Sequence, residues 1–266
     1  MPDAVPRPAD DAGRAAGPDA ADAADAADAA DAVAVIHVVV PARDEAVLLP
    51  ACLDALAAAL DHVRRVRPDV EARLTVVLDT CRDESTAICR GRGVDLVEVS
   101  VGNVGAARAA GTARAAALAV AGGVAPGRTW IACTDADSRV PTDWLTDQLA
   151  VAEGDGATTG ADVVLGRVEP DDTAPSEVVV RWHVLHDDGR VGVHGAHLGF
   201  RLSAHDAVGG LAPLAEREDL DLVERLLSAG ARYGAARAPV VTSSRLAGRT
   251  PGGFAGFLAA LNHPLG

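Results

Sequence analysis

The sequence predicts an α/β protein built on a mainly parallel sheet, doubly wound, with helices on both faces. Two observations predict it. Short Val- and Ile-rich runs alternate with Ala-rich helical stretches from residue 33 onward, which is the order of a parallel sheet with crossover helices. The 266 residues are 49% hydrophobic but only 3% aromatic, so the core consists of Val, Leu and Ala, as in parallel strands covered by helices.

The expected elements of the first half follow from these runs in order. Each strand is an apolar β-rich run, and each helix is an Ala/Leu stretch or opens with Asp, Glu or Ser; Pro50 falls in the first turns of its helix, where proline is tolerated. The expected strands are residues 33–40, 74–78, 94–99 and 129–133. The expected helices are residues 46–60, 83–90 and 104–121 and one that begins at Thr142.

The second half, from about Gly160, has a looser order and predicts an α+β region that completes a site. We expect two domain halves, residues 33–160 and 161–266, behind a tail of residues 1–32. The expected segments of the second half are residues 163–168, 177–185, 196–202, a helix around 219–229, a strand near 239–242 and a final apolar helix after Phe254.

The tail of residues 1–32 repeats Ala-Ala-Asp. A three-residue Asp period spirals around a helix and builds no apolar face, so we expect disorder or a fraying helix without a role in chemistry.

Composition excludes several function classes. All 24 basic residues are Arg, which excludes a Schiff-base or Walker-type lysine. The tail carries −6 of the net charge of −14, and the acidic remainder argues against nucleic-acid or anionic-lipid partners. The four cysteines form no C-x-x-C pattern, and neither a signal peptide nor a membrane span is evident, so a cytoplasmic protein with reduced thiols is expected.

Carboxylates follow two of the predicted strands directly. Asp135 and Asp137 come after residues 129–133, and Asp79 comes after residues 74–78. The carboxyl ends of parallel strands form the ligand crevice of open α/β sheets, and hard oxygen donors there suit Mg²⁺ or Mn²⁺. A solvated loop is the alternative for a bare D-x-D.

Two further loops point to the same edge. Pro41 stops the first strand, and Arg43 and Glu45 follow it; acidic capping of a helix explains Glu45 equally well. After the third strand, Gly105 and Arg108 begin a helix of small residues. Its free amides would attract phosphate and Arg108 would add a bidentate contact, although close helix–sheet packing is an equal explanation.

The order of these pieces resembles family 2 glycosyltransferases of the GT-A fold. The segments that carry the resemblance run from about residue 33 to 261, and they are PARDEA, Asp79 after a strand, GNVGAARAAG, TDADSRVPTDWL and Glu218-Asp219. The resemblance implies a GT-A fold, Rossmann-like with an acceptor-side α+β region, a nucleotide-diphospho-sugar donor, Mg²⁺ or Mn²⁺, and inversion at the anomeric carbon.

The resemblance also implies roles for residues on the donor side. The first-strand loop (Pro41, Arg43, Glu45) and Asp79 would hold the nucleoside. The family pattern D-D-G-S or D-N-G-S is replaced here by Asp79-Thr80-Cys81-Arg82, which leaves the contacts to the base open.

The chemical roles fall on three carboxylates. Asp137 would bind the metal directly, and Asp135 would lie near the ribose or the metal. Asp219 would be the base that deprotonates the acceptor hydroxyl, whereas capping of the helix that follows explains the acidic run on sequence alone.

Histidines and late arginines are ambiguous. His183 and His186, and then His194 and His197, form two H-x-x-H pairs; a structural zinc site is a minor alternative to an acceptor pocket lined by residues 194–197, and His194 would alternatively complete the metal shell. Arg245 and Arg249 would close over the diphosphate, or be solvated loop residues.

The sequence therefore predicts a metal-dependent, inverting, single-transfer glycosyltransferase. Both the Q-x-x-R-W motif and the membrane helices of processive synthases are absent. The alternatives are a nucleotidyltransferase of related fold, against which the lack of a Gly-rich triphosphate loop argues, and a non-catalytic nucleotide-sugar-binding protein. The donor base, the sugar and the acceptor do not follow from the sequence.

Overall fold

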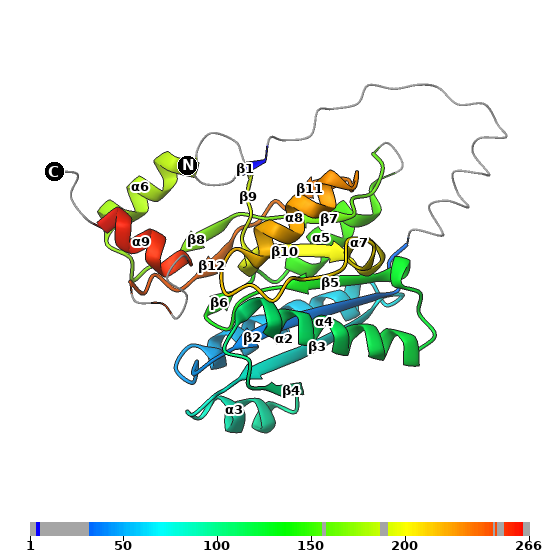
Figure 1. Cartoon of the computed structure of the whole chain (residues 1–266), viewed down its shortest axis with the longest axis horizontal. Coiled ribbons are helices and arrows are strands. Elements are labelled where there is room, and N and C mark those ends of the chain that lie inside the picture. Colours follow the sequence, from blue (N-terminus) through cyan, green and yellow to red (C-terminus); the bar gives the residue numbers. More distant parts are fainter. Residues whose placement is uncertain are drawn as a thin grey trace.

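A seven-stranded sheet forms the centre of the molecule in the computed structural model, which describes residues 4–5, 32–155, 158–186, 191–246, 248 and 253–262. The strand order is β11-β7-β10-β5-β2-β3-β4 (Figure 1). Its strands are β2 (Val35–Ala42), β3 (Glu71–Asp79), β4 (Asp95–Val99), β5 (Thr129–Cys133), β7 (Val163–Leu165), β10 (Leu198–Arg201) and β11 (Tyr233–Ala235).

The direction of the strands brings several loops to one edge. Strands β2, β3, β4 and β5 pair in parallel, so their carboxyl ends share an edge. Strand β10 runs antiparallel to β5, with Leu198 opposite Cys133. The residues just before β10 therefore meet the residues just after β5.

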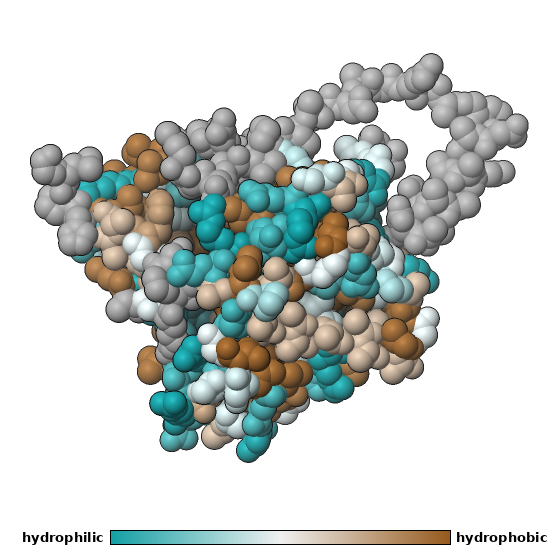
Figure 2. Space-filling model, in the orientation of Figure 1, coloured by the Kyte–Doolittle hydropathy of each residue, from teal (hydrophilic) through white to brown (hydrophobic). Residues whose placement is uncertain are grey.

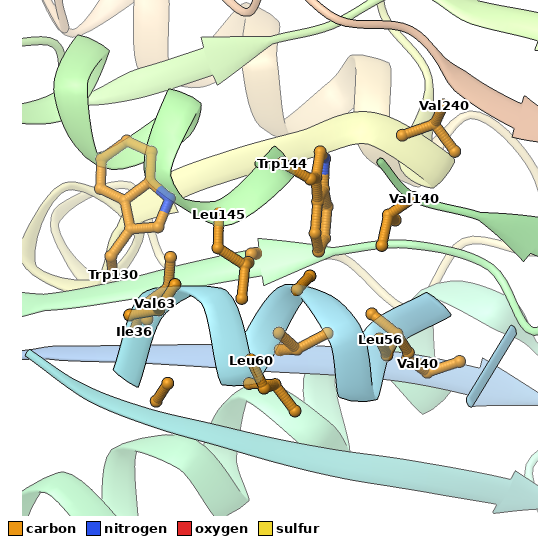
Figure 3. Close-up of a cluster of buried hydrophobic side chains, with 14 of the residues drawn as sticks. Ile36, Val40, Leu56, Leu60, Val63, Trp130, Val140, Trp144, Leu145 and Val240 are labelled. Atoms are coloured by element: carbon orange, nitrogen blue, oxygen red, sulfur yellow. The ribbon is translucent and has the colours of Figure 1, made fainter. Parts of the chain in front are cut away.

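Helices cover both faces of this sheet because the apolar residues of each strand alternate between the faces. On one face, α2 (Leu49–Val66), α3 (Ser85–Arg92) and α5 (Trp144–Glu153) pack on Ile36, Val38 and Trp130. Figure 3 shows part of this cluster, with Leu56, Leu60 and Val63 of α2 and the buried tryptophans Trp130 and Trp144.

The other face carries α4 (Val104–Ala121), α7 (Leu202–Ala207) and α8 (Glu218–Ser228), which pack on Val39, Ile131 and Phe200. Helix α4 approaches closely because a Cβ on Gly111 would lie 2.4 Å from Val39 Cγ1 and 2.8 Å from Val77 Cγ2. Any larger residue at this position would push the helix off the sheet.

Shorter elements complete the second half. A three-stranded sheet has the order β6-β12-β8, with β6 (Ser138–Arg139), β12 (Val240–Thr242) and β8 (Val168–Pro170). Helix α6 (Ser176–His186) packs on α9 (Phe254–Asn262) through Val178, Trp182 and Leu258. The remaining elements are η1 (Pro126–Arg128), η2 (Gly195–His197), and β1 (Ala4–Val5) paired with β9 (Val191–Gly192).

The predicted fold class is confirmed, and α4 and β5 have the predicted bounds. The segment expected at residues 163–168 holds parts of two strands, because β7 and β8 belong to different sheets and separate at Gly166. Helix α2 begins three residues later than expected, after Asp44 adopts a left-handed φ of 52°. Helix α7 and strands β6, β9 and β11 were not predicted, because short elements carry little periodicity.

Two other expectations concern the ends and the membrane. The tail prediction falls on residues 1–32, of which only Ala4, Val5 and Ala32 belong to the described residues. Across the part of the chain that the structure describes, no helix has both the length and the apolar character needed to cross a membrane.

Candidate active site

The carboxyl edge of the parallel strands gathers the predicted acidic residues on three neighbouring loops. Asp79 ends β3, Asp135 and Asp137 follow β5, and Glu45 follows β2. Three residues beside these loops, Asp44, Thr80 and Arg217, have positive φ values of 52°, 58° and 59° although none is glycine. Such strained backbone concentrates where a fold holds functional groups in place.

Asp79 is buried and holds the start of the loop before α4. Its carboxylate accepts N–H bonds from Val101 (2.9 Å), Gly102 (2.9 Å) and Asn103 (3.0 Å). Burial alone would raise the pKa of Asp79, but these bonds and one from the Thr80 hydroxyl hold its pKa below the ordinary value. Asp79 therefore shapes the loop that faces the strand edge.

Arg108 connects the two acidic motifs. Its guanidinium pairs with Asp135 and with Glu218, and the Arg108 and Glu218 side chains are each only 4% exposed. Buried charges need such partners. Arg108 therefore ties the loop after β5 to the start of α8, and its contact with a phosphate stays a prediction.

Two glycines make room for this arrangement. A Cβ on Gly195 would lie 2.3 Å from the guanidinium nitrogens of Arg108. A Cβ on Gly105 would lie 2.5 Å from Ala212 O, and the Gly105 amide donates to Leu214 O at 3.2 Å. Gly105 thus brings α4 against residues 212–218, and its N–H is already used within the protein.

Asp219 is the second residue of α8 and follows Glu218, the partner of Arg108. Its Oδ2 accepts the Gly195 N–H at 2.6 Å, and its Oδ1 accepts the Leu220 N–H at 2.8 Å. The neighbouring His194 has its pKa lowered to about 4 by burial, with Asp219 opposing that shift. The imidazole is therefore neutral at physiological pH.

A second arginine joins the loop after β2 to the loop after β5. Arg245 donates to both carboxylate oxygens of Glu45, at 2.8 and 2.7 Å, and lies 2.8 Å from Asp137 Oδ2. Burial and the charge of Asp135 raise the pKa of Asp137 to about 6, although Arg245 lowers it. The site thus holds more negative charge than its arginine balances.

A cavity of about 350 Å³ lies next to His194, between α6 and the strands β8 and β9. Its lining includes Arg167, Glu169, Trp182, His183, His186 and His194. The His186 ring stacks on Trp182 at a centroid distance of 3.7 Å, and Phe254 and Phe257 meet Trp182 edge-on. This aromatic packing sets the wall of the cavity.

The other predicted residues do not take part in the Arg108 and Arg245 ion pairs that the described residues form. Pro41 lies within β2, Arg43 is exposed with Nη1 against Gly102, and Arg249 falls outside the described residues. His197 does not line the cavity, because it is fully buried, lies near Trp144 and bonds through Nδ1 to Arg167 O. The H-x-x-H pair is split because η2 turns its second histidine into the core.

Sequence reasoning missed Glu218 as an ion-pair partner, and it missed Thr242. Thr242 Oγ1 reaches Asp137 Oδ1 at 3.4 Å and accepts from Ser138 Oγ at 2.8 Å. The signal for Glu218 was its place beside Asp219 in a run of acids, but only the fold shows that it meets Arg108.

A divalent ion fits the donor set around Asp137, because carboxylate oxygens in excess of the local positive charge are hard ligands. The structure does not gather His194 with Asp135 and Asp137. Among the described residues, the group with ligand atoms close enough for one ion is Asp44, Cys81 and Asp83.

That other group has competing partners. Asp44 accepts the Arg82 N–H at 2.6 Å, and Asp83 accepts the Ala46 N–H at 2.8 Å. Burial raises the pKa of the Cys81 thiol, so its metal-binding thiolate is disfavoured. These bonds fasten the loop after β2 to the loop after β3.

In open α/β sheets, ligands bind in the crevice outside the carboxyl ends of the strands, which is where these acidic residues lie. The sequence model described as "Glycosyl transferase family 2" matches residues 37–200. This match covers more than half of the chain, so the protein belongs to glycosyl transferase family 2. No curated protein sequence matches the chain.

Solved structures agree on the GT-A fold. TarS 1-349 of S. aureus superposes with a TM-score of 0.56 at 15% identity, covering 79% of this chain and 60% of TarS 1-349; its complex with UDP has the same TM-score. The mannosyltransferase PcManGT of Pyrobaculum calidifontis, in complex with GDP-Man and Mn²⁺, gives 0.52 at 18% identity, with 78% and 56% covered. The chain thus spans less than two thirds of either structure.

Proposed function

We propose that this protein transfers a sugar, with inversion, from a nucleotide-diphospho-sugar to an acceptor hydroxyl. The observation that carries the proposal is a pair of arginine-centred clusters at one sheet edge: Arg108 joins Asp135 to Glu218, and Arg245 joins Asp137 to Glu45. Family membership supports the activity class. The neighbours solved with UDP and with GDP-Man and Mn²⁺ support a nucleotide-sugar donor and a divalent ion.

On the donor side, Asp137 and Asp135 would hold Mg²⁺ or Mn²⁺. The ion would stabilise the charge of the leaving diphosphate. Asp79 orders the loop at residues 101–103 that borders the nucleoside, while Glu45 and Arg43 offer polar contacts from the loop after β2. Arg245 is placed to contact the diphosphate, since its guanidinium already lies at Asp137.

On the acceptor side, Asp219 would take the proton of the attacking hydroxyl. Its carboxylate is oriented by the Gly195 N–H and adjoins His194 of the cavity. We therefore place the acceptor in the cavity beside α6. A base oriented in this way typically contributes 10²–10⁴-fold to the rate.

A donor screen tests the proposal. Calorimetric titration of nucleoside diphosphates and nucleotide-sugars, with and without Mn²⁺, should show metal-dependent binding. Release of a nucleoside diphosphate identifies a glycosyltransferase, whereas release of pyrophosphate identifies a nucleotidyltransferase. Absence of any metal-dependent nucleotide binding would instead favour a non-catalytic protein on this fold.

Two variants test the assigned carboxylates. Asp137→Ala should lose metal-dependent donor binding, whereas Asp143→Ala, an exposed acid nearby, should retain it. Asp219→Asn should keep donor binding and lose at least about 10²-fold in turnover. Asp221→Asn is its control, since Asp221 pairs with Arg225 on the same helix; full turnover by Asp219→Asn would place the base elsewhere.

A further inference from the structure

The position of Arg245 has a consequence for metal binding. Its guanidinium bridges two carboxylates that are themselves poorly exposed, Glu45 at 9% and Asp137 at 14% of the side chain. Both Glu45 oxygens and Asp137 Oδ2 take part. The Arg245 guanidinium thus occupies the place that a cation bound to Asp137 would need.

The other oxygen of Asp137 is weakly engaged. Among the side chains that the structure describes, Asp137 Oδ1 has the long 3.4 Å contact from Thr242 Oγ1 and no closer one, and this distance is at the limit for a hydrogen bond. Asp135, the second acid of the motif, is held by Arg108. The Asp137 carboxylate therefore has Arg245 as its one close positive charge among the described residues, and two cations on one carboxylate repel each other.

The backbone that carries Arg245 is fixed independently of this ion pair. Strand β12 pairs with β6, and the Ser243 N–H donates to Asp137 O at 3.1 Å. The Arg245 N–H donates to Ser243 Oγ at 3.3 Å. The Arg245 guanidinium can thus leave Asp137 by side-chain rotation, while the backbone of residues 243–245 stays next to residues 135–137.

We propose that Arg245 is a built-in counter-ion that competes with the divalent cation for Asp137. Loading of the metal moves the guanidinium from Asp137 to the diphosphate of the donor, so that metal and nucleotide bind as a pair. This inference rests on the proposed function, because it assigns Asp137 to the metal. Arg245 would therefore weaken the binding of the metal alone and strengthen the binding of the nucleotide.

Calorimetric titration of Mn²⁺ alone, and then of a nucleoside diphosphate at saturating Mn²⁺, tests this in Arg245→Gln. Without its competitor, Mn²⁺ should bind about tenfold more tightly than in the wild type, whereas the nucleoside diphosphate should bind about tenfold more weakly. Arg114→Gln removes the same charge from an ion pair on α4, and it should change neither affinity.

The outcomes separate the two hypotheses. If Mn²⁺ binds Arg245→Gln as tightly as the wild type or more weakly, and Asp137→Ala abolishes Mn²⁺ binding, then the proposed competition by Arg245 is wrong and the proposed metal site is retained. Mn²⁺ binding that Asp137→Ala does not affect overturns the assigned metal site itself. Arg245→Lys is the substitute variant if Arg245→Gln fails to fold. A single ammonium cannot pair with Glu45 and Asp137 as the guanidinium does, so it should compete less and Mn²⁺ should bind about threefold more tightly than in the wild type.

Discussion

The main sheet and the α6–α9 pair differ sharply in how much core holds them. The sheet has two large apolar clusters, one on each face, whereas α6 and α9 share three buried hydrophobic side chains. Figure 2 shows apolar surface over α6 and α9, where Val180 and Val184 are 61% and 73% exposed. Local stability follows buried apolar contact, so we expect the sheet to be rigid and the α6–α9 wall of the cavity to be held less firmly.

The largest expected effect lies within the sheet region, at Arg108, which ties the loop after β5 to the start of α8. Arg108→Gln leaves Glu218 buried without its cation, so we expect a loss of about 3–5 kcal/mol in the free energy of unfolding, measured in urea. Arg114→Gln, in an ion pair that is 42% exposed at the arginine, should cost less than about 1 kcal/mol. Similar losses in both variants would mean that the buried Arg108–Glu218 pair does not hold the loop after β5 to α8.

A matched pair of truncations compares the two cores directly. Leu56 and Leu258 are both fully buried, but Leu56 belongs to a large cluster and Leu258 to the small one. Leu56→Ala should cost about 3 kcal/mol of global stability. Leu258→Ala should shift global unfolding much less and should speed hydrogen exchange in α6; an equal global loss would show that α6 and α9 unfold together with the sheet.

A smaller loss of stability is expected at Asp79, whose carboxylate holds the loop before α4 through three hydrogen bonds. Asp79→Asn replaces an oxygen with an amide that cannot accept all three N–H groups, so it should cost about 2 kcal/mol at neutral pH. Because the folded-state pKa lies below the ordinary 3.8, the stabilisation is present above that value and is lost as pH falls through the folded pKa.

The pH dependence supplies the control for this variant. The wild type and Asp79→Asn should differ most in urea midpoint at neutral pH and should converge as the pH falls below about 4. A difference that stays constant across this range would mean that the variant acts through packing and not through the carboxylate charge.

Sequence reasoning was strongest where a pattern repeats. The alternation of strand and helix through residues 33–153 predicted the parallel sheet, and the acids after β3 and β5 predicted which edge would be polar. It left residues 163–168 as one segment, because two short strands in one apolar run give no signal of the sheet each joins. It left a phosphate contact of Arg108 and close helix–sheet packing as equal explanations, since sequence does not show that Glu218 and Asp135 reach Arg108.

The sequence by itself determined the fold class, the polar edge and the family, because periodicity and strand-end carboxylates are local properties of the chain. Only the tertiary structure decided the pairing of charges, since the partners of Arg108 and Arg245 lie up to 200 residues away in sequence. Which carboxylate meets which guanidinium depends on strand register and on two glycines without a Cβ. Those contacts exist only after the chain has folded.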